Sequence, residues 1–266
     1  METGKILFLN EREVKTLLTP QKVLDLVEIS LADFAKGDSV NPVKLHLPMY
    51  PDYDGYINSM PSYIRKMNIA GVKLVSVYNY NTVKYGLSST MGTIILYHPE
   101  TGIPFSIMDG TYITAMRTGA VVGVTAKYLA KKNSEVLTII GAGAQGFTSF
   151  VMVAIAMDTI KEVRIVDINP EAQKLFIEKA SRQFPKIKYI EISDIQSACT
   201  GSDIVVSATT AGKPLLLDIA IDKGTTVIGV SEKLTREFIG KFDKFIVDFA
   251  ECLMERQNQM EDMQQS

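Results

Sequence analysis

One short motif limits what this chain can fold into more than any other feature. The motif is Gly141-Ala-Gly143-Ala-Gln-Gly146, which directly follows the apolar segment LTII and precedes an apolar stretch of helical character. Asp167 stands 21 residues after Gly146, at the end of the next apolar segment. The motif alone is weak evidence, but a strand before it, a helix after it and an acid at this spacing together predict a Rossmann-type domain.

Each position of the motif has an expected physical role. The first glycine permits a tight turn, the second lets the backbone approach a pyrophosphate, and the third lets the helix pack against the strand. The free N–H groups at the helix start then favour the negative phosphates. Asp167 is expected to accept hydrogen bonds from the ribose hydroxyls and to repel a 2′-phosphate. We therefore expect the cofactor to be NAD rather than NADP, bound at Gly141, Gly143, Ala144, Gln145, Gly146 and Asp167. The alternative is a glycine-rich turn in an α/β fold that binds no cofactor.

Strand-like and helix-like segments alternate from about residue 135 onward. The expected strands are 137–141, 163–167, 188–192, 203–209, 225–230 and 244–248, and the expected helices are 145–159 and 170–184. Because the strands are continuous apolar runs, they predict a doubly wound parallel sheet covered on both faces. Thr209 and Thr210 end one of these strands, where ligands bind in such sheets. They are expected to contact the cofactor, or alternatively only to cap the strand.

The first half of the chain has a different texture. Residues 12–36 show helical periodicity with a break at Pro20, for which Thr19 is a plausible N-cap. Residues 56–110 are rich in strand formers, with a turn at 98–102, and residues 111–131 read as a helix. The fold class is thus α/β, a Rossmann-type doubly wound sheet plus an α+β domain. We expect a substrate-binding and dimerisation domain at 1–118, a Rossmann domain at 119–250 and a C-terminal tail at 251–266.

Composition narrows the function classes. Hydrophobic residues make up 46% of the chain and the formal net charge is −2, which argues for a globular protein and against nucleic-acid binding. No apolar run is long enough to span a membrane, and no secretory signal is apparent. The only cysteines, Cys199 and Cys252, are interpreted as inert thiols in a reducing cytoplasm rather than as a reactive pair. No cluster has metal-ligand spacing, so no metal is expected.

At this point the residues resemble a known family. The run LYHPETGIPFSIMDGTYITAMRTGAVVGVTAKYLAKK, followed by LTIIGAGAQG, closely resembles the ornithine cyclodeaminase/mu-crystallin family, and MPSYI and GVKLVSVY match in the right order. The resemblance covers residues 5–248. It implies a Rossmann domain joined to a substrate and dimerisation domain, and a reaction on an amino or imino acid, because members include alanine dehydrogenases, ketimine reductases, opine-type dehydrogenases and ornithine cyclodeaminases.

Three cations carry over from the family as substrate residues. They are Lys44, where the family usually has arginine, Lys73 of the GVK motif and Arg117 of the RT motif. The resemblance implies that all three hold the substrate carboxylate, with Lys73 and Arg117 as the catalytic residues and Lys73 able to act in proton transfer. The alternatives are an edge-strand lysine reaching water for Lys73, a structural salt bridge for Arg117 and an ordinary loop lysine for Lys44.

Two departures from the family leave the reaction open. Lys233 stands where cyclodeaminases carry an aspartate. The C-terminus is expected to be a shortened one, because members usually continue for several tens of residues past the last strand and this sequence stops soon after Asp248. The leading hypothesis is an NAD-dependent amino-acid dehydrogenase or imine reductase. The alternatives are an ornithine cyclodeaminase, which makes proline and ammonia, and a dinucleotide-binding protein with impaired catalysis. We also expect a homodimer formed mainly through residues 1–120, because the apolar strands of this region need a partner to cover them.

Overall fold

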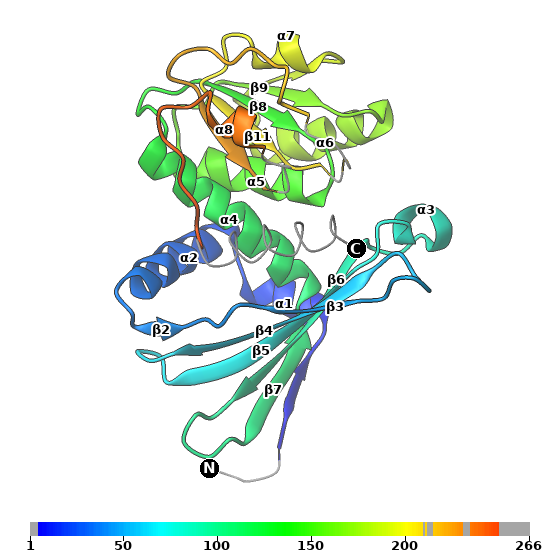
Figure 1. The fold of residues 1–266 in the computed structure, drawn as a ribbon, viewed down its shortest axis with the longest axis vertical. Helices are drawn as coiled ribbons and strands as arrows, with labels where there is room; N and C mark the ends of the chain where they lie inside the picture. The colour runs from blue at the N-terminus through cyan, green and yellow to red at the C-terminus, as the bar shows by residue number, and fades with distance from the viewer. Residues whose placement is uncertain (1–4, 210, 212–214, 231–234, 250–266) are drawn as a thin grey trace. The chain divides into compact units, whose positions relative to one another are not determined.

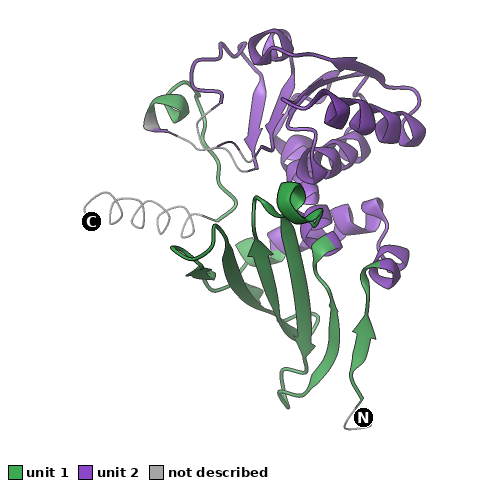
Figure 2. Ribbon diagram, turned by 90° about the vertical axis from the view of Figure 1, so that its right-hand side faces the viewer, with its two compact units in different colours: residues 1–11, 33–111, 236–266 green, residues 12–32, 112–235 purple. Residues whose placement is uncertain are grey.

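The computed structural model describes residues 5–209, 211, 215–230 and 235–249. The chain divides into two compact units, drawn in different colours in Figure 2. Unit 1 comprises residues 1–11, 33–111 and 236–266, and unit 2 comprises residues 12–32 and 112–235. Both units are assembled from separate stretches of chain, whereas the functional domains expected from the sequence are contiguous. The assignment of functions to the two domains stays a prediction.

Unit 2 contains a five-stranded parallel sheet. Its strands are β8 (Val136–Ile140), β9 (Glu162–Val166), β10 (Lys188–Glu191), β11 (Ile204–Ser207) and β12 (Thr226–Gly229). They are ordered β10-β9-β8-β11-β12, and every neighbouring pair is parallel. The helices between and before them are α4 (Thr111–Leu129), α5 (Ala144–Ala156), α6 (Pro170–Gln183) and α7 (Ile195–Cys199), seen with the sheet in Figure 1. The predicted parallel α/β sheet is confirmed.

The core of unit 2 explains why these segments form a sheet. The central strands are apolar and buried along their length, and Phe150 and Phe176 from the helices pack at 5.4 Å between ring centroids. Helices α4 and α5 approach so closely that a side chain at Gly119 would meet the backbone of Thr148, and one at Gly123 would meet Met152. Glycine at these two positions therefore sets the distance between the helices.

The predicted break at Pro20 separates α1 (Glu11–Leu17) from α2 (Pro20–Ala35). Thr19 caps α2 as expected, because its Oγ1 accepts the backbone N–H of Lys22 at 3.3 Å. Val23 and Leu24 of α2 are buried in a cluster with Met116 of α4. The two-helix interpretation of residues 12–36 is confirmed.

Unit 1 is built on a mixed seven-stranded sheet. Its strands are β1 (Leu7–Leu9), β2 (Ser39–Val40), β3 (Leu45–Pro48), β4 (Tyr56–Ile64), β5 (Ile69–Val77), β6 (Thr90–Tyr97) and β7 (Pro104–Asp109). The order is β1-β7-β6-β5-β4-β2, with β3 also paired to β4. Among the described strands of this sheet, only β1 and β7 pair in parallel. The short helix α3 (Asn81–Tyr85) connects β5 to β6, and the predicted turn at 98–102 connects β6 to β7.

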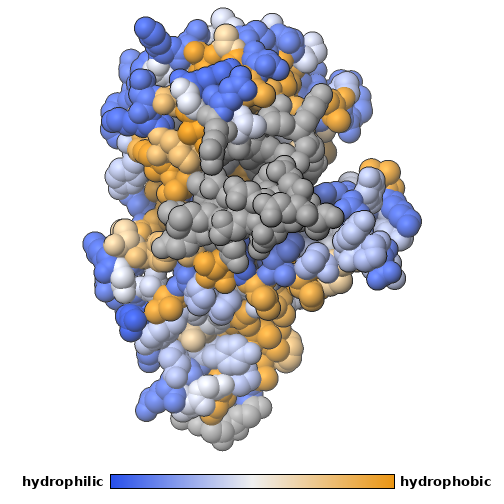
Figure 3. All heavy atoms as spheres, viewed as in Figure 1, coloured by the Kyte–Doolittle hydropathy of each residue, from blue (hydrophilic) through white to orange (hydrophobic). Residues whose placement is uncertain are grey.

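One face of this sheet carries apolar side chains in contact with solvent. Leu45 of β3, Ser59 of β4 and Leu74 of β5 are register partners, so their side chains lie on the same face. Two residues further along β3, Leu47 begins a second line of register partners on that face, which ends at Met91 of β6. Leu45 is 71% exposed and Leu74 is 40% exposed. Figure 3 shows further apolar surface along the β1 edge of the sheet. Large exposed apolar patches on a soluble protein commonly mark interaction surfaces.

One predicted strand is absent. Residues 244–248 were expected to form the last Rossmann strand, yet they form no strand and lie in unit 1, after the short helix α8 (Arg236–Ile239). Phe245 and Ile246 are 44% and 59% exposed. An apolar run becomes a strand only when a neighbour satisfies its backbone, and no described strand pairs with these residues. Among the described residues, no helix is long and apolar enough to cross a membrane.

Candidate dinucleotide site

The strand order of unit 2 creates the place where a dinucleotide would bind. From the central strand β8 the chain moves to β9 and β10 on one side, and from β11 to β12 on the other. The carboxyl ends of β8 and β11 therefore flank a topological switch point, where open α/β sheets bind their ligands. The glycine-rich loop follows β8, and Ala208 and Thr209 follow β11. The backbone N–H of Ala208 donates to the carbonyl of Ile140 at 2.8 Å, so the two loops start side by side.

The three glycines of the loop have different surroundings. Gly141 has a φ of +103°, which side-chain-bearing residues rarely adopt, and a Cβ there would lie 2.6 Å from the carbonyl oxygen of Ala208. A Cβ at Gly146 would overlap the carbonyl oxygen of Gly141 and lie 3.1 Å from Cγ2 of Ile139. Gly143 is different, because within the described part of the chain a Cβ there would meet no atom within 4 Å. Two glycines thus allow the chain to fold, and the third leaves space open beside the helix start.

The residues around this open space suit a dinucleotide. Gly143 is the N-cap of α5 and makes no side-chain cap, so the first-turn N–H groups of Ala144 and Gln145 suit an anion. The side-chain oxygen Oε1 of Gln145 is buried without a hydrogen-bond partner. An orphaned buried acceptor needs an explanation, and a bound donor such as a ligand hydroxyl or amide would supply one.

Asp167 follows the last residue of β9, directly beside the glycine-rich loop. Its Oδ2 accepts the backbone N–H of Ala142 at 2.7 Å, and its Oδ1 accepts the N–H of Asn169 at 2.8 Å. A carboxylate offers about four acceptor positions, so two remain for ribose hydroxyls. Asp167 was expected at the end of this strand from the sequence, whereas its hydrogen bond with Ala142 was not predictable.

Thr209 and Thr210 follow β11 in the sequence, and the structure describes the first of them. Thr209 Oγ1 accepts the backbone N–H of Ala211 at 3.3 Å, and its Cγ2 lies 3.1 Å from the position of a Cβ on Gly141. Thr209 therefore stands at the switch point next to the loop. Thr210 lies outside the described residues.

The two candidate lysines lie at neighbouring register positions of the mixed sheet in unit 1. Lys73 is half-buried in β5, directly opposite Met60 of β4. Lys44 is also half-buried and immediately precedes β3, whose first residue, Leu45, pairs with Ser59 of β4. The lysines therefore flank the same part of β4, with backbones about 10 Å apart across two strand spacings. This separation suits two cations that share one small anionic ligand.

Arg117 lies on α4 and belongs to unit 2. Arg117 is half-buried, and Thr114 and Gly119, which precede and follow it along the helix, are buried. Unit 2 thus holds Arg117 and the described residues of the glycine-rich loop, Asp167 and Thr209, while unit 1 holds the two lysines. A joint role of the three cations stays a prediction.

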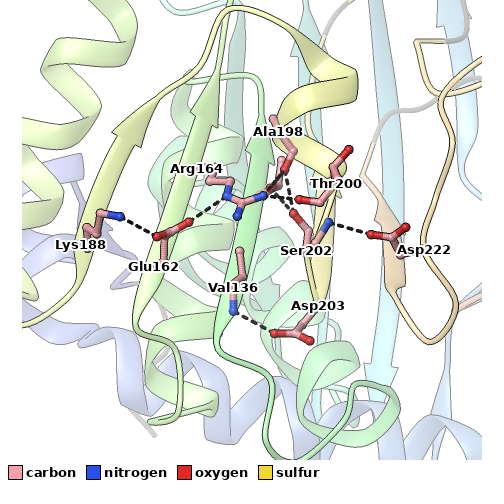
Figure 4. Close-up of polar contacts among 11 residues, drawn as sticks. Val136, Glu162, Arg164, Lys188, Ala198, Thr200, Ser202, Asp203 and Asp222 are labelled. Atoms are coloured by element: carbon pink, nitrogen blue, oxygen red, sulfur yellow. Dashed lines mark hydrogen bonds and ion pairs between the residues drawn. The ribbon is translucent and has the colours of Figure 1, made fainter.

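A second polar cluster lies at the amino ends of the strands, away from the glycine-rich loop (Figure 4). Arg164 of β9 donates to the carboxylate of Glu162 at 2.9 Å and to the backbone carbonyls of Ala198 and Thr200 at 3.1 and 2.5 Å. Glu162 also pairs with Lys188 at 2.9 Å. These two cations, first Lys188 and then Arg164, hold the pKa of Glu162 below its usual 4.5. This cluster was not among the sites expected from the sequence, although an arginine inside an apolar strand is a visible signal.

The fold and this loop define the class of protein, a Rossmann-type dinucleotide-binding enzyme with a second, mixed-sheet unit. Residues 5–245 match the model of the ornithine cyclodeaminase/mu-crystallin family, and the chain belongs to that family. It is therefore an NAD(P)-dependent oxidoreductase of the kind that acts on amino and imino acids.

Three relatives show how near the resemblance is. The structure of a Thermococcus litoralis Δ1-pyrroline-2-carboxylate reductase with NADH and L-proline is 35% identical, has a TM-score of 0.79, and matches 84% of this chain and 68% of its own. An archaeal alanine dehydrogenase dimer with bound NAD is 32% identical, has a TM-score of 0.76, and matches 84% and 67%. A Staphylococcus aureus N-((2S)-2-amino-2-carboxyethyl)-L-glutamate dehydrogenase is 30% identical and matches 95% and 77%. The match spans about two thirds to three quarters of each relative.

Proposed function

We propose that this protein is an NAD-dependent amino-acid dehydrogenase or imine reductase acting on a small α-amino or imino acid. The observation that carries the proposal is the glycine-rich loop at the β8–β11 switch point, with open space at Gly143 and the carboxylate of Asp167 beside it. The relatives that are 30% identical or more support the substrate class, because their names specify alanine, proline and a glutamate derivative as ligands or substrates.

The residues of the chain have separate roles in this proposal. The α5 start and Asp167 hold the dinucleotide, which when bound supplies or accepts the hydride at the substrate Cα. Arg117 and Lys44 bind the substrate carboxylate, for which a guanidinium is suited to two parallel hydrogen bonds and an ammonium to a point contact. Lys73 binds the same carboxylate or moves a proton at the substrate amine. Fixing the substrate in this way positions its Cα for the reaction.

Two alternatives stay open and one assay separates all three. Lys233, at the position where cyclodeaminases carry an aspartate, lies outside the described residues. A panel of amino and imino acids, followed at 340 nm, should show NADH production or consumption with at least one small substrate. Ammonia release from ornithine without net NADH would instead indicate a cyclodeaminase. NADH binding without turnover on the whole panel would indicate a binding protein.

Asp167 leads to a prediction on cofactor choice. NADH should bind more tightly than NADPH, because a carboxylate beside the ribose repels a 2′-phosphate. Replacing Asp167 with Ser should narrow that difference. Fluorescence titrations with NADH and with NADPH measure the two affinities. Equal affinities in the unmutated protein would contradict the role of Asp167.

Arg117 gives a second prediction. Arg117→Ala should weaken substrate binding by roughly 10- to 100-fold, because a charge-assisted contact contributes about 1.5–3 kcal/mol. NADH affinity should stay within a few-fold of the wild type. The control is Arg117→Lys, which keeps the charge but loses the planar fork and should recover part of the affinity. An equal loss of NADH affinity in Arg117→Ala would mean that the residue is structural.

We also propose a cytoplasmic homodimer whose interface is the exposed apolar face of the mixed sheet. The archaeal alanine dehydrogenase is a dimer. Leu45 and Leu74 lie on this face on either side of Ser59. A double substitution to Asp at both leucines should convert the dimer into a monomer in light scattering, because each charge would have to be buried. The control is Met67→Asp, since Met67 is 58% exposed in the β4–β5 turn of the same unit. A wild-type protein that is monomeric at micromolar concentration would refute the proposal.

A further inference from the structure

The hydrogen bond from Ala142 to Asp167 links this carboxylate to the glycine-rich loop in the absence of a cofactor. Strands β8 and β9 pair in parallel register up to Ile140 and Val166, and the ladder ends with the Gly141 N–H donating to the Val166 carbonyl at 2.8 Å. The next N–H in the loop, that of Ala142, has no strand beside it. The Asp167 carboxylate takes the place of the missing strand and accepts this N–H at 2.7 Å.

The carboxylate is itself held in place from α6. Its second oxygen accepts the backbone N–H of Asn169 at 2.8 Å, and the Asn169 side chain caps α6 by accepting the N–H of Glu171 at 3.0 Å. A chain of hydrogen bonds therefore runs from the helix through Asp167 to the loop. Both contacts of Asp167 are charge-assisted, which makes them stronger than bonds between neutral groups.

We propose that Asp167 is a positioning residue that fixes the glycine-rich loop in its binding conformation before any dinucleotide arrives. This inference rests on the proposed function, in which the loop holds the pyrophosphate, and it adds a second role to ribose recognition. The loop needs such a device because its glycines have more backbone freedom than any other residue. Order that exists before binding lowers the entropy cost of binding.

The proposal gives Asp167 an effect on every dinucleotide rather than on NAD alone. A residue that only selects against the 2′-phosphate would, once removed, let NADPH bind more tightly. A residue that also holds the loop would, once removed, weaken NADH strongly and leave NADPH without a gain. The two roles thus predict different outcomes for the same substitution, a gain in NADPH affinity in the first case and no gain in the second.

Hydrogen exchange of the full chain without cofactor tests the first step. The Ala142 amide should exchange about 10-fold faster or more in Asp167→Ser, whose single hydroxyl on a shorter arm cannot hold both N–H groups. Asp167→Asn keeps the shape with one acceptor oxygen and should give a smaller increase. The matched control is Asp194→Ser, since Asp194 also accepts a backbone N–H, that of Ser197 at 2.7 Å, but at the start of α7. A serine can replace it as a cap, so loop exchange and NADH affinity should not change.

Cofactor titrations of the same variants complete the test. We expect NADH affinity to fall about 10-fold or more in Asp167→Ser, and NADPH affinity not to rise above the wild-type value. Unchanged exchange at Ala142, or tighter NADPH binding in Asp167→Ser, would overturn the positioning role. A wild-type protein that binds neither cofactor would instead refute the proposed function, while the exchange rates would still decide whether Asp167 holds the loop.

Discussion

Replacing Gly146 with Ala should lower NADH affinity by roughly 100-fold or more. The new methyl group would overlap the carbonyl oxygen of Gly141, which is backbone and cannot rotate away, and would press on Ile139. The start of α5 must then move away from β8, and its N–H groups leave the position at which they would meet a phosphate. A misplacement of about 1 Å can cost about 100-fold in catalytic rate, and we expect a loss of similar size in binding. Fluorescence titration with NADH measures the loss.

Gly143→Ala is the matched control, because it adds the same methyl group three residues earlier. A Cβ at Gly143 meets no atom of the described residues within 4 Å, and the residue has an ordinary φ of −75°. Its thermal stability should therefore stay close to the wild type, whereas Gly146→Ala should unfold at a lower temperature because overpacking costs about 1–3 kcal/mol. If the open space at Gly143 holds the pyrophosphate, Gly143→Ala should also weaken NADH binding, but without loss of stability. Normal NADH affinity in Gly146→Ala would show that the loop is not the cofactor site.

The parallel sheet could be predicted because its signals are local. Each buried strand of unit 2 is a short apolar run, and the motif from Gly141 to Gly146 fixes the turn between the first strand and its helix. The break between α1 and α2 was equally readable, because Thr19 and Pro20 act within one turn of chain. Local propensity and the final fold agree at these positions, which is why the sequence was informative there.

The segment at 244–248 shows where such signals fail. KFIVD has the same composition as the buried strands, yet whether it pairs depends on a neighbouring strand elsewhere in the chain. Strands β1 and β3 were missed for the converse reason. They are three and four residues long and form because β7 and β4 offer free edges. The pairing of strands depends on residues far apart in the sequence, so a run of apolar residues alone does not predict it.

The candidate site divides in the same way. The types and spacing of Gly141, Gly146 and Asp167 indicated a dinucleotide loop, but the bond from Ala142 to Asp167 required coordinates. Lys73 was singled out by the GVK motif of the family, and it is also a lysine in an apolar strand, which is costly unless it has a partner. Arg164 stands in the strand EVRIV in the same situation, and its partners, which lie up to 36 positions away in sequence, were not predictable.

Arg164→Met should destabilise the protein by about 1.5–3 kcal/mol, because it removes three hydrogen bonds that a charged group donates. The guanidinium serves the Glu162 carboxylate and two backbone carbonyls, and both side chains of the ion pair are at most 20% exposed. Methionine fills a similar volume, so the loss should come from the hydrogen bonds. Denaturant unfolding measures the change. The control is Arg182→Met, since Arg182 pairs with Glu178 on the surface of α6 at 74% exposure and should change stability by less than about 0.5 kcal/mol.

The effect of Arg164→Met should also depend on pH in one direction. Lys188 and Arg164 lower the folded-state pKa of Glu162 below 4.5, so the ion pair stabilises the protein above that pH and the contribution is lost as the pH falls through the lower folded value. The difference in unfolding free energy between wild type and variant should therefore be full at pH 7 and shrink below about pH 4.5. NADH affinity should not change, because Arg164 lies toward the amino ends of the strands and the loop at their carboxyl ends. A difference that stays constant down to pH 3 would show that the carbonyl contacts, and not the ion pair with Glu162, carry the stabilisation.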